Sequence, residues 1–565
     1  MKNTLRGDRS TTLLYWGLWL LLLFFVLYPF LRLLALTFTA DGHFSLASFK
    51  AVASQSYNLR AAKNSVFLAF AVAAAGTTLG FFFAYVVTRL RMPKALKALI
   101  GAITLLPLIS PPFTSSIALT LSLGTNGLLL KLFGLRDIGL YGFRGTFLSE
   151  VLTYFPIAYM TLCTTLSRLD PNLEDAAFSM GASPNRVFRQ ITLPLCTPGL
   201  ANSFLLLFAA SLADFATPLV LGGHGFPLLP TEAYLQITGL YDLKGGAALS
   251  FLLLVPALLV FWAQGRLMKG KNYVTLSGKA GGRARVSGAG PVMTSVMIFF
   301  VALVTVFVLY LYGLIAWGSF VKIWGVDNSF TLANYSYVFT FGKKALKDTL
   351  IVAAIVTPLG GLLSGLLGVI IARGHFKGRK GLETLSLLNY ALPGTVVGIA
   401  YLVAFNDTPA WWPFSWSPFL LTGTVTILVA AYLFRYSSAG VRGTLAALAQ
   451  IDPSIEEASA SLGATPAVTF RKVTLPLILP SVLAGMKYLF IHSMTAISAT
   501  IFLVSVKWSL LTTRILECVT ELQFAQACAF SMVLIALVFI VGGLLDLLSR
   551  FFDHGAVERG NASWN

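Results

Sequence analysis

Long apolar stretches separated by short polar loops run along this chain of 565 residues. A helix that crosses a bilayer needs about 20 apolar residues. The pattern therefore predicts an all-α polytopic membrane protein with twelve transmembrane helices. We place them at residues 12–37, 64–88, 98–122, 146–168, 197–221, 247–268, 291–318, 347–372, 382–404, 419–440, 479–505 and 527–549.

The first apolar stretch follows three basic residues, as the core of a secretory signal would. These residues are Lys2, Arg6 and Arg9. A cleavable signal has an apolar core of roughly 7–15 residues. The stretch at 12–37 is longer than that, so we expect it to be a true transmembrane helix.

Two polar loops in this apolar chain have nearly the same sequence. Residues 174–194 read EDAAFSMGASPNRVFRQITLP, and residues 456–476 read EEASASLGATPAVTFRKVTLP. The longer segments 170–198 and 452–480 align without a gap, and 15 of their 29 positions are identical. Self-similarity over so long an interval indicates a duplicated unit.

The same offset also pairs Pro111 of the third apolar stretch with Pro393 of the ninth. We therefore divide the chain into a first repeat at 1–268, a linker at 269–290 and a second repeat at 291–565. Each repeat has six predicted spans. Because six is even, both repeats are expected to cross the membrane in the same direction, as parallel rather than inverted repeats.

Composition supports a membrane location: 56% of the residues are hydrophobic and only 11% are charged. A soluble domain carries about 25% charged residues. The net charge of +19 could suggest a nucleic-acid partner. However, basic residues gather in loops on one predicted side, including 89–97, 266–285 and 373–380, and the loop at 405–418 has none. This positive-inside pattern predicts that both termini and both repeated loops are cytoplasmic. It also explains most of the excess positive charge without a nucleic-acid partner.

Each repeated loop carries the signals of two short helices joined by a turn. Asp170 is a good N-cap, and Pro171 suits the first helical position. Gly181 can adopt the left-handed conformation that ends a helix, and Pro194 ends the second one. The second copy repeats these signals with Asp452, Pro453, Gly463 and Pro476.

The first short helix of each loop has a stripe of mostly small and apolar residues. The stripe is Leu173, Ala176, Ala177 and Met180 in one copy, and Ile455, Ala458, Ser459 and Leu462 in the other. A helix of about ten residues is not stable alone in water, so it needs a partner surface. That surface is either another protein or the chain's own helices. A DNA-reading role is excluded because the loop is tethered between spans and its second helix is not basic.

The loop pattern resembles the EAA motif of membrane subunits of bacterial ABC importers. The motif appears as Asp175-Ala176-Ala177, Gly181 and Ile191-Thr192-Leu193-Pro194, and again as Glu457-Ala458-Ser459, Gly463 and Val473-Thr474-Leu475-Pro476. The departures are Asp for Glu in the first copy, and Ser for Ala and Val for Ile in the second. The resemblance implies a type I importer permease whose coupling helices dock on cytosolic ATPases. The coupling residues would be Glu174, Asp175, Ala176, Ala177, Gly181, Glu456, Glu457, Ala458 and Gly463.

The resemblance also implies partners and a location. Two cytosolic ABC ATPase subunits would dock on the loops at 170–194 and 452–476, and a periplasmic binding protein would deliver the cargo. The location would be the bacterial inner membrane. We expect no catalytic residue, cofactor or metal site in this chain, because no polar segment is long enough for a nucleotide-binding domain; ATP and Mg²⁺ would be held by the partners. Four cysteines lack metal or disulfide spacing, and we interpret them as packing residues: Cys163, Cys196, Cys518 and Cys528.

A fused permease of this size resembles the ferric-iron branch of these importers, which also has relatives for thiamine and for phosphonate or sugar phosphate. Ferric iron is therefore the expected cargo, with those solutes as alternatives. An ion-coupled secondary transporter is a rival class, but it would need intramembrane carboxylates and would leave the paired loops without a purpose. A membrane-embedded enzyme would need a His, Asp and Glu cluster that the sequence does not offer.

Candidate residues of a translocation path lie inside the predicted spans. Pro111 and Pro393 break equivalent spans, and such breaks are tolerated in lipid only beside protein or a water-filled cavity. Asp214 lies mid-span, where a carboxylate is costly. It would attract a cationic cargo, accept hydrogen bonds from a neighbouring helix, or pair with Lys487 or His492 of the eleventh span. Simple packing roles are the alternative for all five residues.

Overall fold

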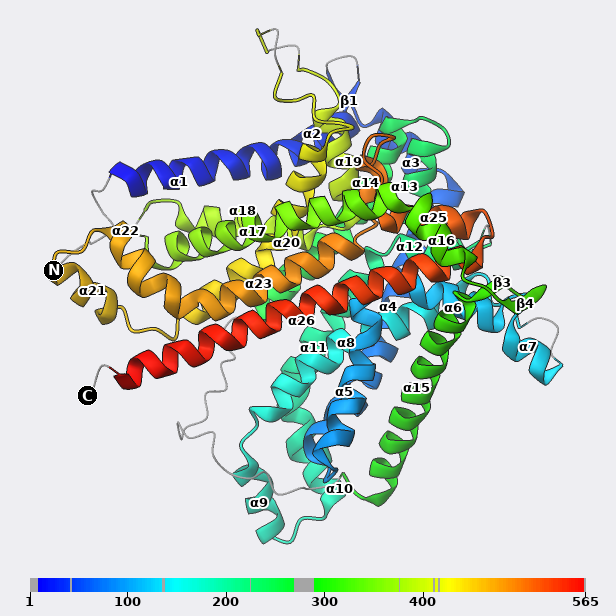
Figure 1. Ribbon diagram of the computed structural model, residues 1–565, viewed down its shortest axis with the longest axis horizontal. Coiled ribbons are helices and arrows are strands. Elements are labelled where there is room, and N and C mark those ends of the chain that lie inside the picture. Colours follow the sequence, from blue (N-terminus) through cyan, green and yellow to red (C-terminus); the bar gives the residue numbers. More distant parts are fainter. Residues whose placement is uncertain are drawn as a thin grey trace.

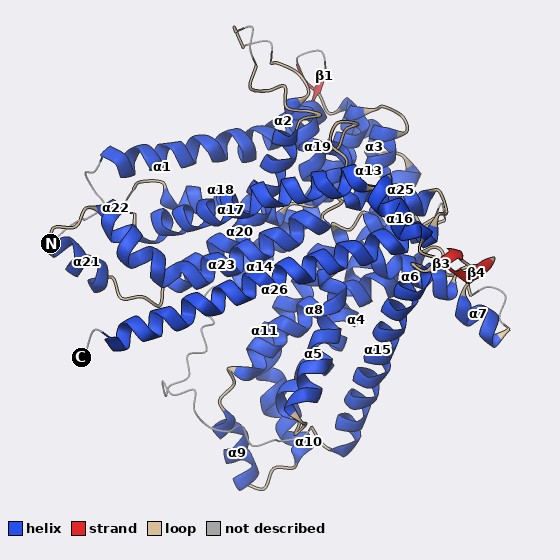
Figure 2. Cartoon of the chain, in the orientation of Figure 1, coloured by secondary structure: helices blue, strands red, loops and turns tan. Residues whose placement is uncertain are grey.

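The computed structural model describes residues 9–40, 43–134, 138–223, 225–268, 289–374, 376–409, 412–414 and 417–562. Over these residues the chain forms a helical bundle with two short β-hairpins (Figures 1 and 2). The all-α membrane fold is therefore confirmed. The predicted linker at 269–290 lies almost wholly outside the described residues.

The elements of the first repeat follow in chain order. They are α1 (Arg9–Leu22), the π-helical turn η1 (Leu23–Leu27), α2 (Tyr28–Phe38), β1 (Thr39–Ala40), β2 (His43–Phe44), α3 (Ala47–Ala53), α4 (Ser56–Arg89), α5 (Lys94–Ile109), α6 (Thr114–Leu123), α7 (Leu128–Phe133), α8 (Phe143–Ser167), α9 (Pro171–Ser179), α10 (Pro184–Val187), η2 (Phe188–Thr192), α11 (Leu193–Leu212), α12 (Ala216–Leu221), α13 (Leu229–Thr238) and α14 (Leu243–Met268).

The second repeat has the same sequence of elements, except that it opens with a single helix and has no counterpart of α7. They are α15 (Pro291–Gly318), β3 (Val321–Ile323), β4 (Asp327–Phe330), α16 (Ala333–Thr340), α17 (Lys343–Arg373), α18 (Arg379–Ala391), α19 (Gly394–Phe405), α20 (Val425–Leu448), α21 (Ser454–Ser461), α22 (Pro466–Thr469), η3 (Phe470–Thr474), α23 (Leu475–Thr495), α24 (Thr500–Leu503), α25 (Leu511–Thr520) and α26 (Phe524–Ala562). Both hairpins, β1–β2 and β3–β4, are antiparallel.

Three helices form the centre of each repeat: α4, α8 and α11 in the first, and α17, α20 and α23 in the second. Glycines allow these helices to approach closely. A Cβ atom on Gly76 would lie 2.5 Å from Leu207, and one on Gly360 would lie 2.5 Å from the equivalent Leu489. Small residues at helix crossings provide the van der Waals contact that drives association in lipid.

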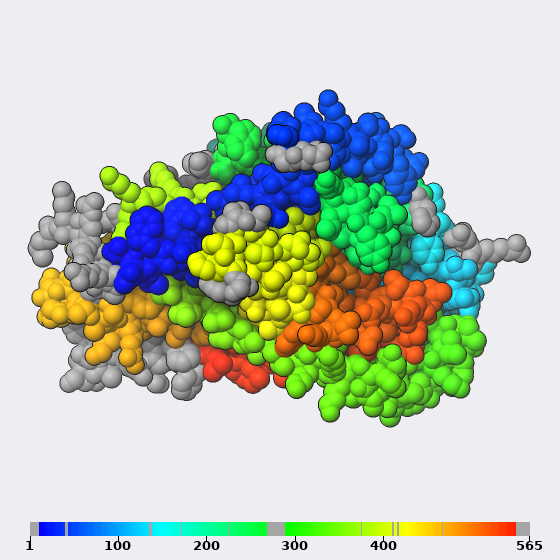
Figure 3. All heavy atoms as spheres, turned by 90° about the horizontal axis from the view of Figure 1, so that it is seen from above, coloured from blue at the N-terminus to red at the C-terminus, as the bar shows by residue number. Residues whose placement is uncertain are grey.

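The opening helices of the two repeats are exchanged. Helix α2 packs on α19 of the second repeat, and α1 contacts α18. In return, α15 packs on α4, α5 and α6 of the first repeat. Figure 1 shows α15 beside the first-repeat helices, and Figure 3 shows the blue N-terminal helices against the yellow part of the second repeat. The sequence repeat did not reveal this exchange.

Fewer described helices are long and apolar enough to span a membrane than the twelve that the sequence predicts. Within the described residues, nine helices meet that criterion, or ten when the pair α18 and α19, bent by 108°, is taken as one broken span. Helices α8 and α20 are also long, with 25 and 24 residues, but they carry buried polar side chains. The total of twelve therefore stays a prediction.

The two repeats extend as two arms from a common end (Figure 1). The short helix α9 lies at the far end of the first arm, and α21 lies at the far end of the second. In Figure 1, β1 lies at the top of the view and β3 and β4 lie at its right, all of them away from α9 and α21. The start of α1 and the end of α26 lie on the side of α21, so both terminal helices point to the side of the repeated loops.

Candidate functional site

Both repeated loops form the predicted helix–turn–helix. Asp170 Oδ1 accepts the backbone N–H of Asn172 at 3.0 Å, and Asp452 Oδ1 accepts that of Ser454 at 2.9 Å. The hydrogen bonds from Ser454 lower the pKa of the Asp452 carboxyl below its ordinary value. Each carboxylate thereby caps a short helix, α9 or α21.

The glycine after each short helix has a backbone conformation that side chains disfavour. Gly181 and Gly463 both have φ of +82°, and the backbone N–H of the next residue donates back into the helix. The bond from Ala182 N to Ala177 O measures 3.0 Å. This left-handed helix ending is the one that the sequence predicted, and it favours glycine because no Cβ is present.

The inner side of α9 is held by an ion pair that sequence reasoning did not find. Arg89 Nη1, in the last turn of α4, lies 3.4 Å from Glu174 Oε2. Thr192 Oγ1 donates to Glu174 Oε1 at 2.8 Å, and Arg89 Nη2 donates to the carbonyl oxygen of Leu166 at 3.3 Å. We call this three-residue cluster, Arg89, Glu174 and Thr192, the first link.

The second repeat contains the same cluster. Arg373 Nε lies 3.1 Å from Glu456 Oε2, and Thr474 Oγ1 donates to Glu456 Oε1 at 3.1 Å. Arg373 Nη2 also donates to the carbonyl oxygens of Leu448, at 3.1 Å, and Ile451, at 2.8 Å. We call Arg373, Glu456 and Thr474 the second link.

Two of the predicted coupling residues belong to the links and do not face a partner protein. Glu174 and Glu456 point into the chain's own helices rather than outward. The side chains of Arg89 and Glu174 are 4% and 7% exposed, and those of Arg373 and Glu456 are 14% and 15% exposed. A sequence signal did exist, because each arginine ends a long apolar helix at nearly the same repeat offset as its glutamate.

The outer side of each short helix is exposed and apolar. Met180 is 82% exposed and its equivalent Leu462 is 89% exposed, and Leu173 and Ile455 are about half exposed. Isolated exposed apolar residues are ordinary on protein surfaces. Here they occur at equivalent positions of the two short helices α9 and α21. The predicted stripe is therefore split, because Ala177 is buried while these residues are not.

The remaining motif residues lie on or near the outer side. Ala176, Gly181, Glu457, Ala458 and Gly463 are exposed, and Asp175 is half-buried. The first motif carboxylate of each copy, Asp175 or Glu457, thus faces away from its link. Each loop consequently has two faces: one fixed to its own repeat and one free to contact another protein.

Both proline breaks are present in the structure. Pro111 lies between α5 and α6, where the backbone N–H of Thr114 donates to its carbonyl oxygen at 2.9 Å. Pro393 lies at the bend between α18 and α19. The helices that follow the breaks, α6 and α19, are almost wholly buried, so the freed backbone groups lie beside protein.

Asp214 lies in the break between α11 and α12, and is 5% exposed. Its Oδ1 accepts the backbone N–H of Ala216 at 2.9 Å and of Thr217 at 3.4 Å, so it caps α12. Glu150 of α8 is fully buried, accepts a hydrogen bond from Ser211, and lies within electrostatic range of Asp214. Sequence reasoning found one buried carboxylate here; the structure has two.

The pairing of Asp214 with Lys487 or His492 is wrong. Lys487 Nζ lies 2.6 Å from Asp546 Oδ2 of α26. His492 Nδ1 lies 3.0 Å from the carbonyl oxygen of Tyr488, and the two rings stack with centroids 3.9 Å apart. Both side chains of α23 are thus engaged by neighbours other than Asp214.

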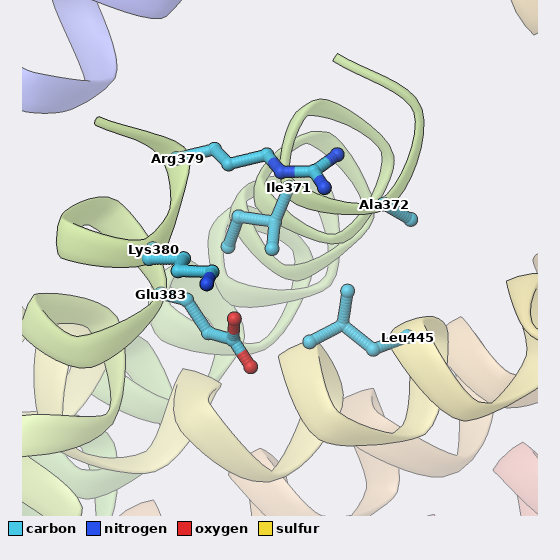
Figure 4. Close-up of a pocket in the computed structure, with 6 residues that line it drawn as sticks. All are labelled: Ile371, Ala372, Arg379, Lys380, Glu383 and Leu445. Carbon is cyan, nitrogen blue, oxygen red and sulfur yellow. The ribbon is translucent and has the colours of Figure 1, made fainter. Parts of the chain in front are cut away.

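An open pocket of about 290 Å³ lies where α17 ends, beside α18 and α20 (Figure 4). Arg379, Lys380 and Glu383 of α18 line one side, and Ile371, Ala372 and Leu445 line the other. Among the described residues, no group of three or more His, Cys, Asp or Glu side chains comes together.

Comparison with known proteins gives matches over both repeats. The sequence profile of the family described as "Binding-protein-dependent transport system inner membrane component" matches residues 76–272 and 364–556. The ferric transport system permease protein FbpB of Actinobacillus pleuropneumoniae is 34% identical over 549 residues, covering 95% of this chain and 78% of its own length. FbpB 1 of Haemophilus influenzae is 35% identical over 515 residues, covering 89% of this chain and 79% of its own length.

A solved bacterial ABC transporter, involved in the import of the acidic polysaccharide alginate, aligns with 46% of this chain and 96% of its own. The TM-score is 0.39 and the sequence identity is 17%.

Proposed function

Because the chain belongs to the family of binding-protein-dependent transport system inner membrane components, we propose that it is the fused permease of an ABC importer for ferric iron. The family profile covers the same region of both repeats. The cargo is taken from the named ferric permeases, which align with most of the chain. The observation that carries the proposal is the pair of loop helices at 170–194 and 452–476, each with an exposed apolar face.

The proposed partners are two cytosolic ABC ATPases and a periplasmic binding protein. Each ATPase would receive one loop helix, with Met180 or Leu462 entering a groove on its surface. A helix whose apolar side chains enter a groove is a common mode of recognition. ATP and Mg²⁺ would be held by these partners, and this chain would move in response. Both termini and both loops would lie in the cytoplasm of the bacterium.

The proposed units are 1–268 and 291–565, joined by a linker at 269–290. Their equivalent central helices support this division, because α4, α8 and α11 correspond in order to α17, α20 and α23. Closure of the two ATPases would bring the ends of the two arms together. The path between the arms would then change from inward-open to outward-open.

The proposed path passes the broken spans at Pro111 and Pro393. Helix α6 follows Pro111 and packs against α8, which carries Glu150, and against α12, which Asp214 caps. The carboxylates of Glu150 and Asp214 would attract a cation. His492 belongs to α23, which is the equivalent of α11 in the second repeat, and Ala496 at the end of α23 stands at the position of Asp214. Lys487 is held by Asp546, which supports a structural role for that lysine.

The decisive experiment is uptake of radioactive ferric ion into proteoliposomes that contain this chain. Vesicles with the chain, its ATPase and its loaded binding protein should accumulate iron only when ATP is present on the ATPase side. Vesicles that lack the ATPase are the matched control and should remain at background. Failure of any ABC ATPase to co-purify with the chain would contradict the proposal.

The two buried carboxylates, Glu150 and Asp214, also favour one rival function, an ion-coupled secondary transporter. Intramembrane carboxylates commonly serve proton or cation relays. That function predicts uptake driven by an ion gradient in vesicles that hold this chain alone. The same control vesicles therefore discriminate the two functions.

A further inference from the structure

We propose that the first and second links are the joints through which each loop helix moves the transmembrane helices of its own repeat. Arg89 and Glu174, with Arg373 and Glu456, would act as positioning residues that convert ATPase movement into helix movement. This inference rests on the proposed function, because it needs an ATPase that pushes the loops.

The first link joins three segments at the Glu174 carboxylate and a fourth through Arg89. Arg89 belongs to the end of α4, Glu174 to α9 and Thr192 to η2, which leads directly into α11. Through its second nitrogen, Arg89 also reaches the carbonyl oxygen of Leu166 near the end of α8. The loop helix is thereby connected to all three central helices of its repeat. A displacement of α9 is therefore passed to them together.

Local bonds within the loop do not fix how α9 lies against the bundle. The bonds made by Asp170 and Gly181 close the two ends of the helix onto itself. The orientation of α9 toward the bundle depends on the Glu174 carboxylate and on the buried Ala177. Hydrogen bonds to a charged group are stronger than neutral ones, and Glu174 accepts such a bond from Thr192 at 2.8 Å while the Arg89 guanidinium lies 3.4 Å away. Glu174 is therefore the polar attachment of α9, and Ala177 the apolar one.

The recurrence of the link supports a mechanical role. The second copy has the same three residue types on equivalent elements, although other positions in the repeated loops have diverged. The two copies differ in burial: the Arg373 and Glu456 side chains are more exposed than Arg89 and Glu174. Solvent weakens an ion pair, so loss of the first link should disturb coupling more than loss of the second.

The test uses the complete transporter in proteoliposomes and measures ferric ion moved per ATP hydrolysed. Arg89→Met and Glu174→Gln should each retain the ATPase, which co-purification with the chain would show. Removing one member of a buried ion pair is strongly disruptive, so ion moved per ATP should fall about tenfold or more. The double exchange of Arg89→Glu with Glu174→Arg should recover part of the loss.

The matched control is Lys322→Met. It removes an exposed ion pair with Asp327 in the β3–β4 hairpin, at the opposite end of the molecule, and should leave the ratio unchanged. If Arg89→Met does not fold, Thr192→Val still tests the first link, because it removes one hydrogen bond and keeps the side-chain shape. It should lower the ratio about threefold, in line with one hydrogen bond.

Two outcomes would overturn the inference. An unchanged ratio in the first-link variants would show that movement reaches the helices by another route. Loss of the ATPase from the complex, with normal thermal stability of the chain, would show that the link serves docking only. These results differ from failure of the proposed function, in which the unchanged chain neither retains an ATPase nor moves iron.

Discussion

Gly181 and Gly463 allow a direct test of the loop geometry. Both have φ of +82°, and nothing lies within 4 Å of the place where a Cβ atom would be. The Cβ atom of a valine at either position would therefore meet no neighbouring atom. The free-energy cost of the substitution comes from the backbone conformation alone. That separation makes the magnitude easy to estimate.

The left-handed conformation costs an ordinary residue about 1–2 kcal/mol, and a β-branched residue more. A strained backbone position costs about 1–3 kcal/mol in total. Since 1.4 kcal/mol corresponds to about tenfold in an equilibrium constant, Gly181→Val should shift the loop away from its native ending by about 5- to 150-fold. The bond from Ala182 to Ala177 would be weakened by the same factor.

The assay compares ATP-driven ferric uptake with thermal unfolding of the same protein. We expect Gly181→Val and Gly463→Val to abolish most uptake, while the unfolding temperature stays near that of the unchanged chain because the site is exposed. Gly181→Asn should keep much of the uptake, because asparagine tolerates left-handed backbone. Gly313→Val in α15 is the matched control, with equal open space and ordinary helical backbone.

Equal uptake by the valine and asparagine variants would refute this reasoning. So would a large fall in unfolding temperature for Gly181→Val alone, because the loop would then support the whole fold.

Two further predictions concern packing and charge. In α4, a Cβ on Gly80 would lie 2.5 Å from the Ala158 Cβ and 2.8 Å from the Tyr159 nitrogen, so Gly80→Val should destabilise the chain by about 1–3 kcal/mol, read as a lower unfolding temperature than Gly313→Val gives. Asp214→Ala should remove the cap of α12 at about 1 kcal/mol, whereas Asp214→Asn should keep the cap and lose the charge. Ferric uptake that falls in both Asp214 variants supports attraction of a cation; uptake that falls only with alanine supports a capping role and contradicts the pathway proposal.

The short-range features of this protein were predictable from its sequence. The N-cap Asp170, the turn residue Gly181 and the proline break at Pro393 depend on the backbone preferences of one or two neighbours. Because the chain is duplicated, each of these local patterns occurs a second time at the equivalent position. Agreement between two copies of the same local pattern makes such predictions dependable.

The long-range features were not predictable from one sequence. The partner of Glu174 lies 85 positions away at Arg89, and no local rule connects them. Lys487 pairs with Asp546 rather than Asp214, because the packing of α23 on α26 decides which charges meet. Glu150 was overlooked because it lies near the start of the predicted span at 146–168, although the structure buries it completely.

The exchanged opening helices also determine where the molecule can bend. Helix α15 packs on α4, α5 and α6 of the first repeat as well as on α26 of its own, and α2 packs on α19 of the second repeat as well as on α14 of its own. In the proposed motion of the arms, bending would occur where these helices leave one arm for the other.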